Sequence, residues 1–193
     1  LREACNENGL ELWIENYGHW GFPGEFLNYG GHADRVSGEF WVGKGGTGPF
    51  GYDAECRIAS SAAHIYGLGP VSAESFTSSH TFVNTPRDLK RFGDYSWTLG
   101  TNHVVFHVYL HQPYPEKPGI CAWFGTDFNR HSTWFSEMGT YVDYIRRSCA
   151  LLQSGEHVAD AAYFIGEDVP VMNAEKNPEL PEVAAFCLGH AAP

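Results

Sequence analysis

The spacing of apolar and polar residues predicts strands and helices that alternate along most of the chain. Short apolar or alternating runs predict strands at 9–16, 36–43, 70–77, 102–110 and 158–168. Helical spacing predicts helices at 54–67, 86–99 and 134–154. Two stretches rich in glycine and aromatic residues, 17–31 and 112–133, are expected to be loops. The opening residues LREACNENGLELW read as a helix end that leads into the first strand.

Residues suited to helix ends support these boundaries. Thr85 is a good N-cap, Pro86 suits the first helical position and Asp88 suits the first turn. Gly67, Gly100 and Gly155 follow the three predicted helices, as C-terminal glycines often do. On the last helix, the apolar stripe is Tyr141, Ile145, Cys149 and Leu152. Asp143 has the spacing to pair with Arg147 there.

This alternation predicts parallel strands joined by right-handed helical crossovers, and therefore an α/β fold. Five strands are about half to two-thirds of an eight-stranded (β/α)8 TIM-type barrel, which usually needs about 250 residues. We expect residues 1–193 to form a single domain that is an incomplete barrel containing only its later strands. An open parallel sheet of five strands is the alternative, which periodicity does not separate from the barrel.

Composition excludes several classes of protein. Twelve basic against 23 acidic residues give a net charge of −11, which excludes a basic nucleic-acid binder. Aromatic residues make up 15% of the chain, too many for an acidic disordered tail. No run of about 18 apolar residues predicts a membrane span, and no signal peptide is visible. Five cysteines without a CxxC pair favour buried free thiols over a disulfide framework or zinc ribbon.

Acidic side chains recur on the predicted strands, at the end of the fold where α/β enzymes place their active sites. Glu15 ends the first strand, Glu39 lies in the second and Glu74 lies in the third, while Glu167 and Asp168 follow the last. Burying an unpaired carboxylate costs several kcal/mol, so each needs a partner, a proton or a function. For any single one of these residues, a structural ion pair is as good an explanation as catalysis. The three glutamates together favour a functional role.

Paired carboxylates in an aromatic cleft suit glycoside hydrolysis. One carboxylic acid, its pKa raised by burial, protonates the leaving oxygen, and the other activates water or attacks the sugar. Trp13 and Trp41 flank the glutamates, and the predicted loops carry further aromatic residues, Trp123 among them. Aromatic faces suit the apolar side of a sugar ring, although an ordinary core uses aromatic residues as well.

Other polar groups support alternative interpretations. His103, His107 and His111 would share one strand face, where one or two could hydrogen-bond a ligand; on a helix the same spacing would suit zinc. Asp127, Asn129 and Arg130 could bind a hydroxylated substrate or cap the following helix. The glycine-rich residues 44–48 lack the order of a phosphate-binding loop.

Several segments together resemble glycoside hydrolase family 106, the α-L-rhamnosidases. In chain order these include SGEFW, ASSAAHIYG, VSAESFT and LLQSGEHVADAAYFIGED. The resemblance covers about residues 9–170. It implies hydrolysis of terminal α-linked L-rhamnose from plant-type glycans with inversion, and a calcium ion at the active site. It also implies periplasmic or secreted location for the full-length protein, although no signal peptide is visible here.

The resemblance also implies roles for individual residues. Glu74 in AESFT matches the general base, and Glu15 matches the acid, with Glu39 in GEFW as the competing acid. The expected substrate-binding residues are Trp13, His19, Trp41, Asn102, His107, Trp123 and Asn129. The calcium ligands are not identified, and Asp34, Asp53 and Asp127 are the acidic residues considered for that role.

The chain also departs from the family pattern. It lacks N-terminal barrel strands and accessory β domains of the family, so we expect part of the site to be missing and the isolated chain to be inactive. Two other functions are also compatible with the sequence. One is a metal-dependent hydrolase that uses His103, His107 and His111, and the other is a non-catalytic carbohydrate-binding barrel.

Overall fold

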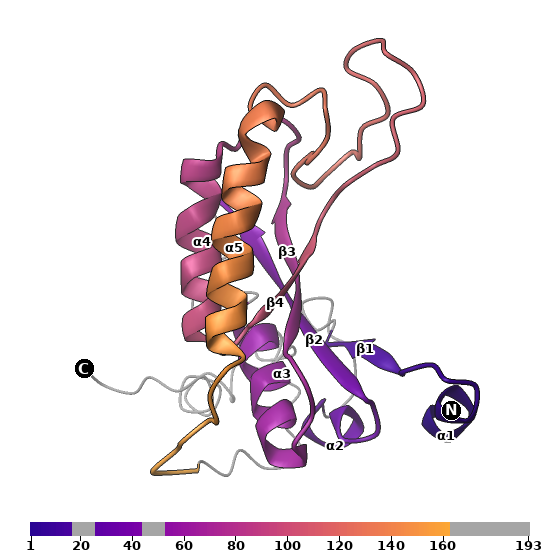
Figure 1. The fold of residues 1–193 in the computed structure, drawn as a ribbon, viewed down its shortest axis with the longest axis vertical. Coiled ribbons are helices and arrows are strands. Elements are labelled where there is room, and N and C mark those ends of the chain that lie inside the picture. Colours follow the sequence, from indigo (N-terminus) through magenta and orange to yellow (C-terminus); the bar gives the residue numbers. More distant parts are fainter. Residues whose placement is uncertain (17–25, 44–52, 163–193) are drawn as a thin grey trace, which may run out of the picture.

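Four parallel strands in the order β1-β2-β3-β4 form the sheet, and helices α3, α4 and α5 cover one of its faces (Figure 1). The computed structural model describes residues 1–16, 26–43 and 53–162, and the element bounds refer to these. The strands are β1 Trp13–Glu15, β2 Arg35–Val42, β3 Ser72–Ser78 and β4 His103–Phe106. The helices are α1 Arg2–Glu7, α2 Phe26–Gly30, α3 Asp53–Tyr66, α4 Pro86–Thr98 and α5 Met138–Leu152, preceded by the 3₁₀ turn η1 Phe135–Glu137.

The parallel sheet confirms the predicted α/β class, and most predicted elements lie where the sequence places them. The N-cap predicted at Thr85 of α4 is confirmed, and it forms a capping box in which Thr85 and Asp88 hydrogen-bond each other's backbone N–H groups. The loop predicted at 112–133 contains no helix or strand. Among the described cysteines, Cys5, Cys56, Cys121 and Cys149 are free thiols, of which only Cys56 and Cys149 are buried.

Some expectations were wrong. The segment predicted as loop 17–31 contains the short helix α2, because Phe26 packs into the core there. The first and fourth strands are much shorter than predicted. Residues 158–162 form no strand, and the rest of that predicted strand lies outside the described residues. Asp143 pairs with Arg146 at 3.1 Å, one residue before the predicted partner Arg147.

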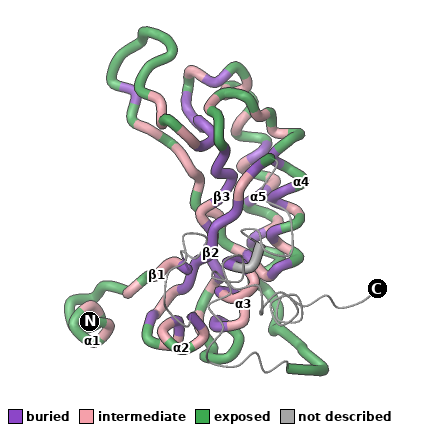
Figure 2. Tube along the Cα trace, turned by 180° about the vertical axis from the view of Figure 1, so that it is seen from behind, coloured by how far each residue is buried: buried purple, intermediate pink, exposed green. Residues whose placement is uncertain are grey.

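The covered face of the sheet carries the hydrophobic core. Phe40, Ala73 and Phe76 from the strands pack against α4, α5 and the loop that follows β4, in the larger of two core clusters. In the smaller cluster, Val36 packs against α2 and α3. Gly38 allows α3 to approach β2 closely, since a Cβ at that position would lie 2.6 Å from the backbone nitrogen of Cys56. Figure 2 shows these buried positions along β2 and β3.

The opposite face of the sheet carries polar side chains. Glu39 on β2 is directly opposite Glu74 on β3, and Glu15 on β1 is opposite Ser37. Since side chains alternate between faces along a strand, these three glutamates share the face that α3, α4 and α5 leave uncovered. The loop that follows β4 extends beyond the carboxyl end of β3 (Figure 1). In the described part of the chain, no helix is long and apolar enough to cross a membrane.

Candidate active site

The three predicted glutamates are brought together on the polar face. Glu39 and Glu74 lie in the interior of their strands rather than at the carboxyl ends, while Glu15 ends β1 as expected. Side chains directly opposite one another on neighbouring strands lie about 5 Å apart, and like charges at that distance destabilise the sheet. The arrangement therefore favours protonation of some of the three carboxyl groups, because this reduces the repulsion between them.

Glu15 is partly buried at the end of β1. Burial raises the pKa of its carboxyl group to about 7, and the negative charges of Glu74 and Glu55 raise it further. A carboxyl group with a pKa near neutrality can hold a proton for transfer and release it to a leaving oxygen. These are the properties required of a general acid.

Glu39 is the most deeply buried of the three, with 1% of its surface exposed. Burial raises its pKa to about 9, and the charges of Glu55, Glu74 and Glu15 act in the same direction. The indole N–H of Trp41 donates a hydrogen bond to Glu39 Oε1, which opposes part of this rise. Glu39 is therefore protonated at neutral pH.

Glu74 occupies a more open position beside Thr77 and His107. Its side chain is 27% exposed, and Thr77 Oγ1 donates a hydrogen bond of 2.8 Å to Glu74 Oε1. His107 Nδ1 lies 3.9 Å from the same oxygen. Glu74 thus has one hydrogen-bonded carboxyl oxygen and remains partly accessible to solvent, as a group that contacts a water molecule must be.

Aromatic side chains form one side of the site. Phe124 stacks against Trp41 with ring centroids 5.9 Å apart, and its ring lies 5.0 Å from that of His107. Trp123 packs edge-on against Phe124 and is 91% exposed. Gly125 makes room for the His107 ring, because a Cβ there would lie 2.7 Å from His107 Nδ1. Trp13 is also exposed, on β1.

The structure does not gather the three histidines into a metal site. The strand ends at Phe106, so the alternation expected to align His103, His107 and His111 stops before His107. His103 Nδ1 hydrogen-bonds Ser72 Oγ at 2.9 Å, whereas His107 faces Glu74. Across residues 1–16, 26–43 and 53–162, no three His, Cys, Asp or Glu side chains are placed to hold a metal ion.

Two predicted substrate-binding asparagines have structural partners. Asn102 Oδ1 accepts a hydrogen bond from the backbone N–H of Val71, at the amino end of β4, away from the glutamates. Asn129 is buried, donates to Asp127 Oδ1 at 3.0 Å and accepts from the backbone N–H of His131. Arg130 donates to the carbonyl of Tyr114. The contacts of Asn129 and Arg130 lie within the loop, and neither residue caps the following helix, which was the alternative to substrate binding for residues 127–130.

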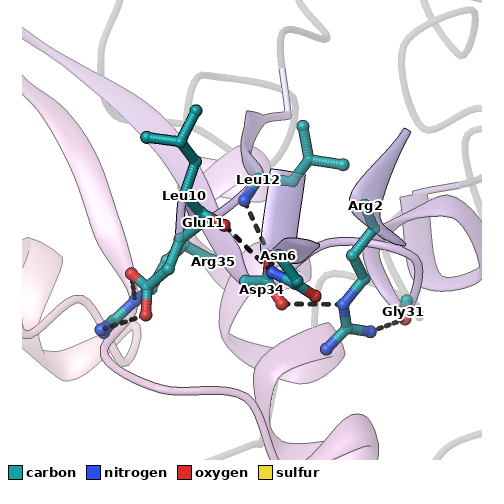
Figure 3. Close-up of polar contacts among 8 residues, drawn as sticks. All are labelled: Arg2, Asn6, Leu10, Glu11, Leu12, Gly31, Asp34 and Arg35. Atoms are coloured by element: carbon teal, nitrogen blue, oxygen red, sulfur yellow. Dashed lines mark hydrogen bonds and ion pairs between the residues drawn. The ribbon is translucent and has the colours of Figure 1, made fainter. Parts of the chain in front are cut away.

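Two of the three residues considered for calcium binding have other partners. The Asp34 carboxylate accepts hydrogen bonds from Arg2, Asn6 and the backbone N–H of Leu12, which tie α1 to the sheet (Figure 3). Asp127 is buried beside Asn129, and burial raises its pKa. Calcium needs about six to eight oxygen ligands, and Asp34 and Asp127 do not belong to any group of three metal-ligating side chains among the described residues.

Four other predicted features fall where the structure gives no description. His19, the glycine-rich segment 44–48, Glu167 and Asp168 all lie outside the described residues, and the side chain of Asp53 is likewise not described.

Two residues of the site were missed by sequence reasoning. Glu55, near the start of α3, is 1% exposed, and its charge raises the pKa of both Glu15 and Glu39. Glu55 could have been identified from the sequence, because it follows the second strand and lies at a helix N-terminus, where negative charge is favourable. Thr77 gave no comparable signal, because its contact with Glu74 depends on an irregularity in β3.

Comparison with known proteins identifies the family. The model of the Glyco_hydro_106 family, described as alpha-L-rhamnosidase, matches residues 1–191. A protein of Formosa agariphila, provisionally named a beta-glucuronidase, is 41% identical over 171 residues, which are 88% of this chain and 14% of that protein. A rhamnosidase structure from Novosphingobium sp. PP1Y matches with a TM-score of 0.80 and 37% identity, over 88% of this chain and 17% of that one. The chain thus spans less than one fifth of either relative, and it belongs to glycoside hydrolase family 106, the alpha-L-rhamnosidases.

Proposed function

We propose that the full-length protein is a glycoside hydrolase that cleaves terminal α-L-rhamnosyl linkages with inversion. The observation that carries the proposal is the shared face of β1, β2 and β3, which presents Glu15, Glu39 and Glu74. The pKa of the Glu15 and Glu39 carboxyl groups is raised there by burial, whereas Glu74 accepts a hydrogen bond from Thr77. Opposite environments for neighbouring carboxyl groups are typical of an acid and base pair.

In this mechanism Glu74 is the general base. It takes a proton from a water molecule that attacks the anomeric carbon, while a protonated glutamate transfers its proton to the departing glycosidic oxygen. Exchange of one carbon–oxygen bond for another in a single displacement inverts the anomeric configuration. The aromatic residues Trp41, Phe124 and Trp123 provide surfaces for the apolar side of the sugar.

The spacing of the strands argues against Glu39 as the acid of an inverting pair. Inverting enzymes hold their two carboxyl groups about 6.5–9.5 Å apart, to leave room for water, and retaining enzymes hold them about 5–5.5 Å apart. Glu39 is on the strand next to Glu74, and neighbouring strands are about 4.8 Å apart. Glu15 is two strands from Glu74 and level with Ser72, so it is separated from Glu74 by more than one strand spacing and leaves room for water. Its pKa of about 7 also allows proton release, whereas Glu39 at about 9 holds its proton more firmly.

We also propose that the sheet is part of a (β/α)8 barrel whose interior is the carboxylate face. Parallel strands with helices on one face are the unit of such a barrel, and the barrel interior carries the other face. The proposed interior side chains are polar here, as expected where a substrate enters.

A neutral sugar fits this face better than a uronic acid. Rhamnose has no charge, whereas a glucuronide carries a carboxylate that would approach the carboxylate of the proposed base, Glu74. Repulsion between like charges in a partly desolvated site costs binding energy. The provisional name of the Formosa agariphila relative makes a glucuronide the natural comparison substrate.

The test uses the full-length protein with an aryl α-L-rhamnoside and an aryl β-glucuronide. We expect cleavage of the rhamnoside, with the inverted anomer appearing first by NMR. Glu74→Gln should abolish turnover, while Glu116→Gln, a change at an exposed loop residue, should leave it unchanged. Release of the retained anomer would contradict single displacement. Rhamnoside binding without release of sugar would instead support a non-catalytic carbohydrate-binding protein.

A further inference from the structure

A bulge in β3 places Thr77 and Glu74 on the same face of the sheet. In a regular strand, residues three apart point to opposite faces. The pairing of β2 with β3 shifts by one residue at this point, from Phe40↔Ser75 to Trp41↔Thr77, so that Phe76 is the extra residue. Phe76 has a φ of 68°, in the left-handed region that phenylalanine rarely adopts. The bulge therefore returns Thr77 to the side that carries Glu74.

The strain at Phe76 is compensated by packing and is linked to a polar contact. The Phe76 ring is fully buried and contacts Phe40, Phe106, Phe128 and Tyr141. Strained backbone in a β-bulge is often found next to an active site, where it redirects a side chain. Here the redirected side chain is Thr77, which is fully buried and donates to Glu74 Oε1 at 2.8 Å.

The two groups beside Glu74 approach the same carboxylate oxygen. Thr77 Oγ1 and His107 Nδ1 lie 2.8 Å and 3.9 Å from Oε1. Among the described residues, no hydrogen bond is made to Oε2, and the side chain is partly open to solvent. One oxygen is therefore held, and the other is left to face the substrate side.

We propose that Thr77 is a positioning residue for the reaction, which fixes Glu74 Oε1 so that Oε2 faces the attacking water. The proposal rests on the proposed role of Glu74 as general base. The hydroxyl group acts through Glu74 and does not itself contact the substrate. A misplacement of the base by about 1 Å is enough to reduce turnover about a hundredfold.

The experiment compares Thr77→Val with Thr77→Ser in the full-length protein. Valine keeps the shape of threonine without its hydroxyl group, and serine keeps the hydroxyl group. For Thr77→Val we expect kcat to fall about ten- to a hundredfold with little change in KM. Thr77→Ser should recover kcat.

Several outcomes overturn the proposal. The positioning role is wrong if Thr77→Val keeps the wild-type kcat, if KM rises as much as kcat falls, or if Thr77→Ser is as impaired as Thr77→Val. If Thr77→Val does not fold, Thr77→Ala replaces it in the same comparison with serine. Glu74→Gln is measured in parallel. Retained turnover in that variant would remove Glu74 as the base and the role of Thr77 with it, whereas lost turnover beside a normal Thr77→Val would reject only the positioning role.

Discussion

Glu39 and Glu74 lie directly opposite each other on neighbouring parallel strands, one fully buried and the other partly open. Two charged carboxylates at this distance would repel each other, so the buried one keeps its proton. Burial is the largest cause of the raised pKa of Glu39, about 9, and the charges of Glu55 and Glu74 add to it. The pair thus places a protonated carboxyl group beside Glu74, the proposed base.

The first prediction concerns the pH dependence of stability. A carboxyl group whose pKa is about 4.5 unfolded and about 9 folded binds more protons in the native state between these values. Stability is therefore highest below about pH 4.5 for this group and decreases as pH rises towards 9. Thermal unfolding of the full-length protein should show a lower midpoint at pH 9 than at pH 6. In Glu39→Gln, which cannot ionise, this difference should shrink.

The control for this prediction is Glu156→Gln, which changes an exposed glutamate and should retain the wild-type pH dependence. A variant Glu39→Gln with the same decrease between pH 6 and pH 9 as the wild type would show that Glu39 does not carry the effect.

A second prediction separates Glu15 from Glu39 as the general acid. Loss of the acid should reduce kcat/KM by about 10²–10⁴-fold for rhamnosides with a poor, alkyl leaving group. An activated aryl leaving group needs little protonation, so its cleavage should be reduced much less. We expect this pattern in Glu15→Gln, together with loss of the basic limb of the pH profile, which the pKa of Glu15 predicts near pH 7 for the wild type. The same leaving-group dependence in Glu39→Gln, and not in Glu15→Gln, would reverse the assignment.

Sequence reasoning identified what depends on local pattern and composition. The three glutamates were found because each lies on a predicted strand, and parallel strands with matching periodicity bring such residues to one face. The boundaries of α4 followed from Thr85, Pro86 and Asp88, whose effects on a helix end are local. The parallel direction of the strands followed from the alternation of elements.

The contacts that sequence reasoning missed depend on irregular backbone or distant packing. The sequence of residues 75–77 does not indicate that Phe76 takes a positive φ, yet that angle decides the face on which Thr77 lies. Asn102 resembled a ligand-binding residue, but it satisfies the backbone of Val71 instead. The fourth strand stops at Phe106, and this early end separates His103 from His107. Each of these outcomes depends on tertiary contacts rather than on local sequence preference.

A third prediction concerns the bulge residue in the core. Phe76→Ala removes a fully buried ring that contacts four other aromatic rings, and we expect the free energy of unfolding to fall by about 3–5 kcal/mol. Denaturant unfolding, followed by intrinsic fluorescence, measures the change. Leu151→Ala is the control, because Leu151 is largely exposed on α5 and its loss should change stability by about 0.5 kcal/mol or less. Equal effects of the two substitutions would contradict the packing described for Phe76.

A fourth prediction concerns the attachment of α1 to the sheet through Asp34. The backbone N–H of Leu12, the Asn6 side chain and Arg2 lower the pKa of Asp34 below its usual value. The stabilising contribution is therefore present above the unfolded pKa, near 4, and is lost as pH falls through the lower folded value. Asp34→Ala should increase amide hydrogen exchange in α1 and at Leu12. Glu11→Gln, which removes only an exposed ion pair with Arg35, should not.

The last prediction concerns Trp123, which has a hydrophobic side chain in open solvent beside the proposed site. A residue that is 91% exposed contributes little to the core, so its removal should leave thermal stability unchanged. If its ring stacks on the substrate equally in the ground state and the transition state, Trp123→Ala should raise KM up to about tenfold with kcat nearly unchanged. Tyr114→Ala, a change at another exposed aromatic residue of the same loop, is the control and should leave both constants unchanged. Equal KM values for Trp123→Ala and the wild type would show that sugar binding does not use this ring, and the stacking surface would then be limited to Trp41 and Phe124.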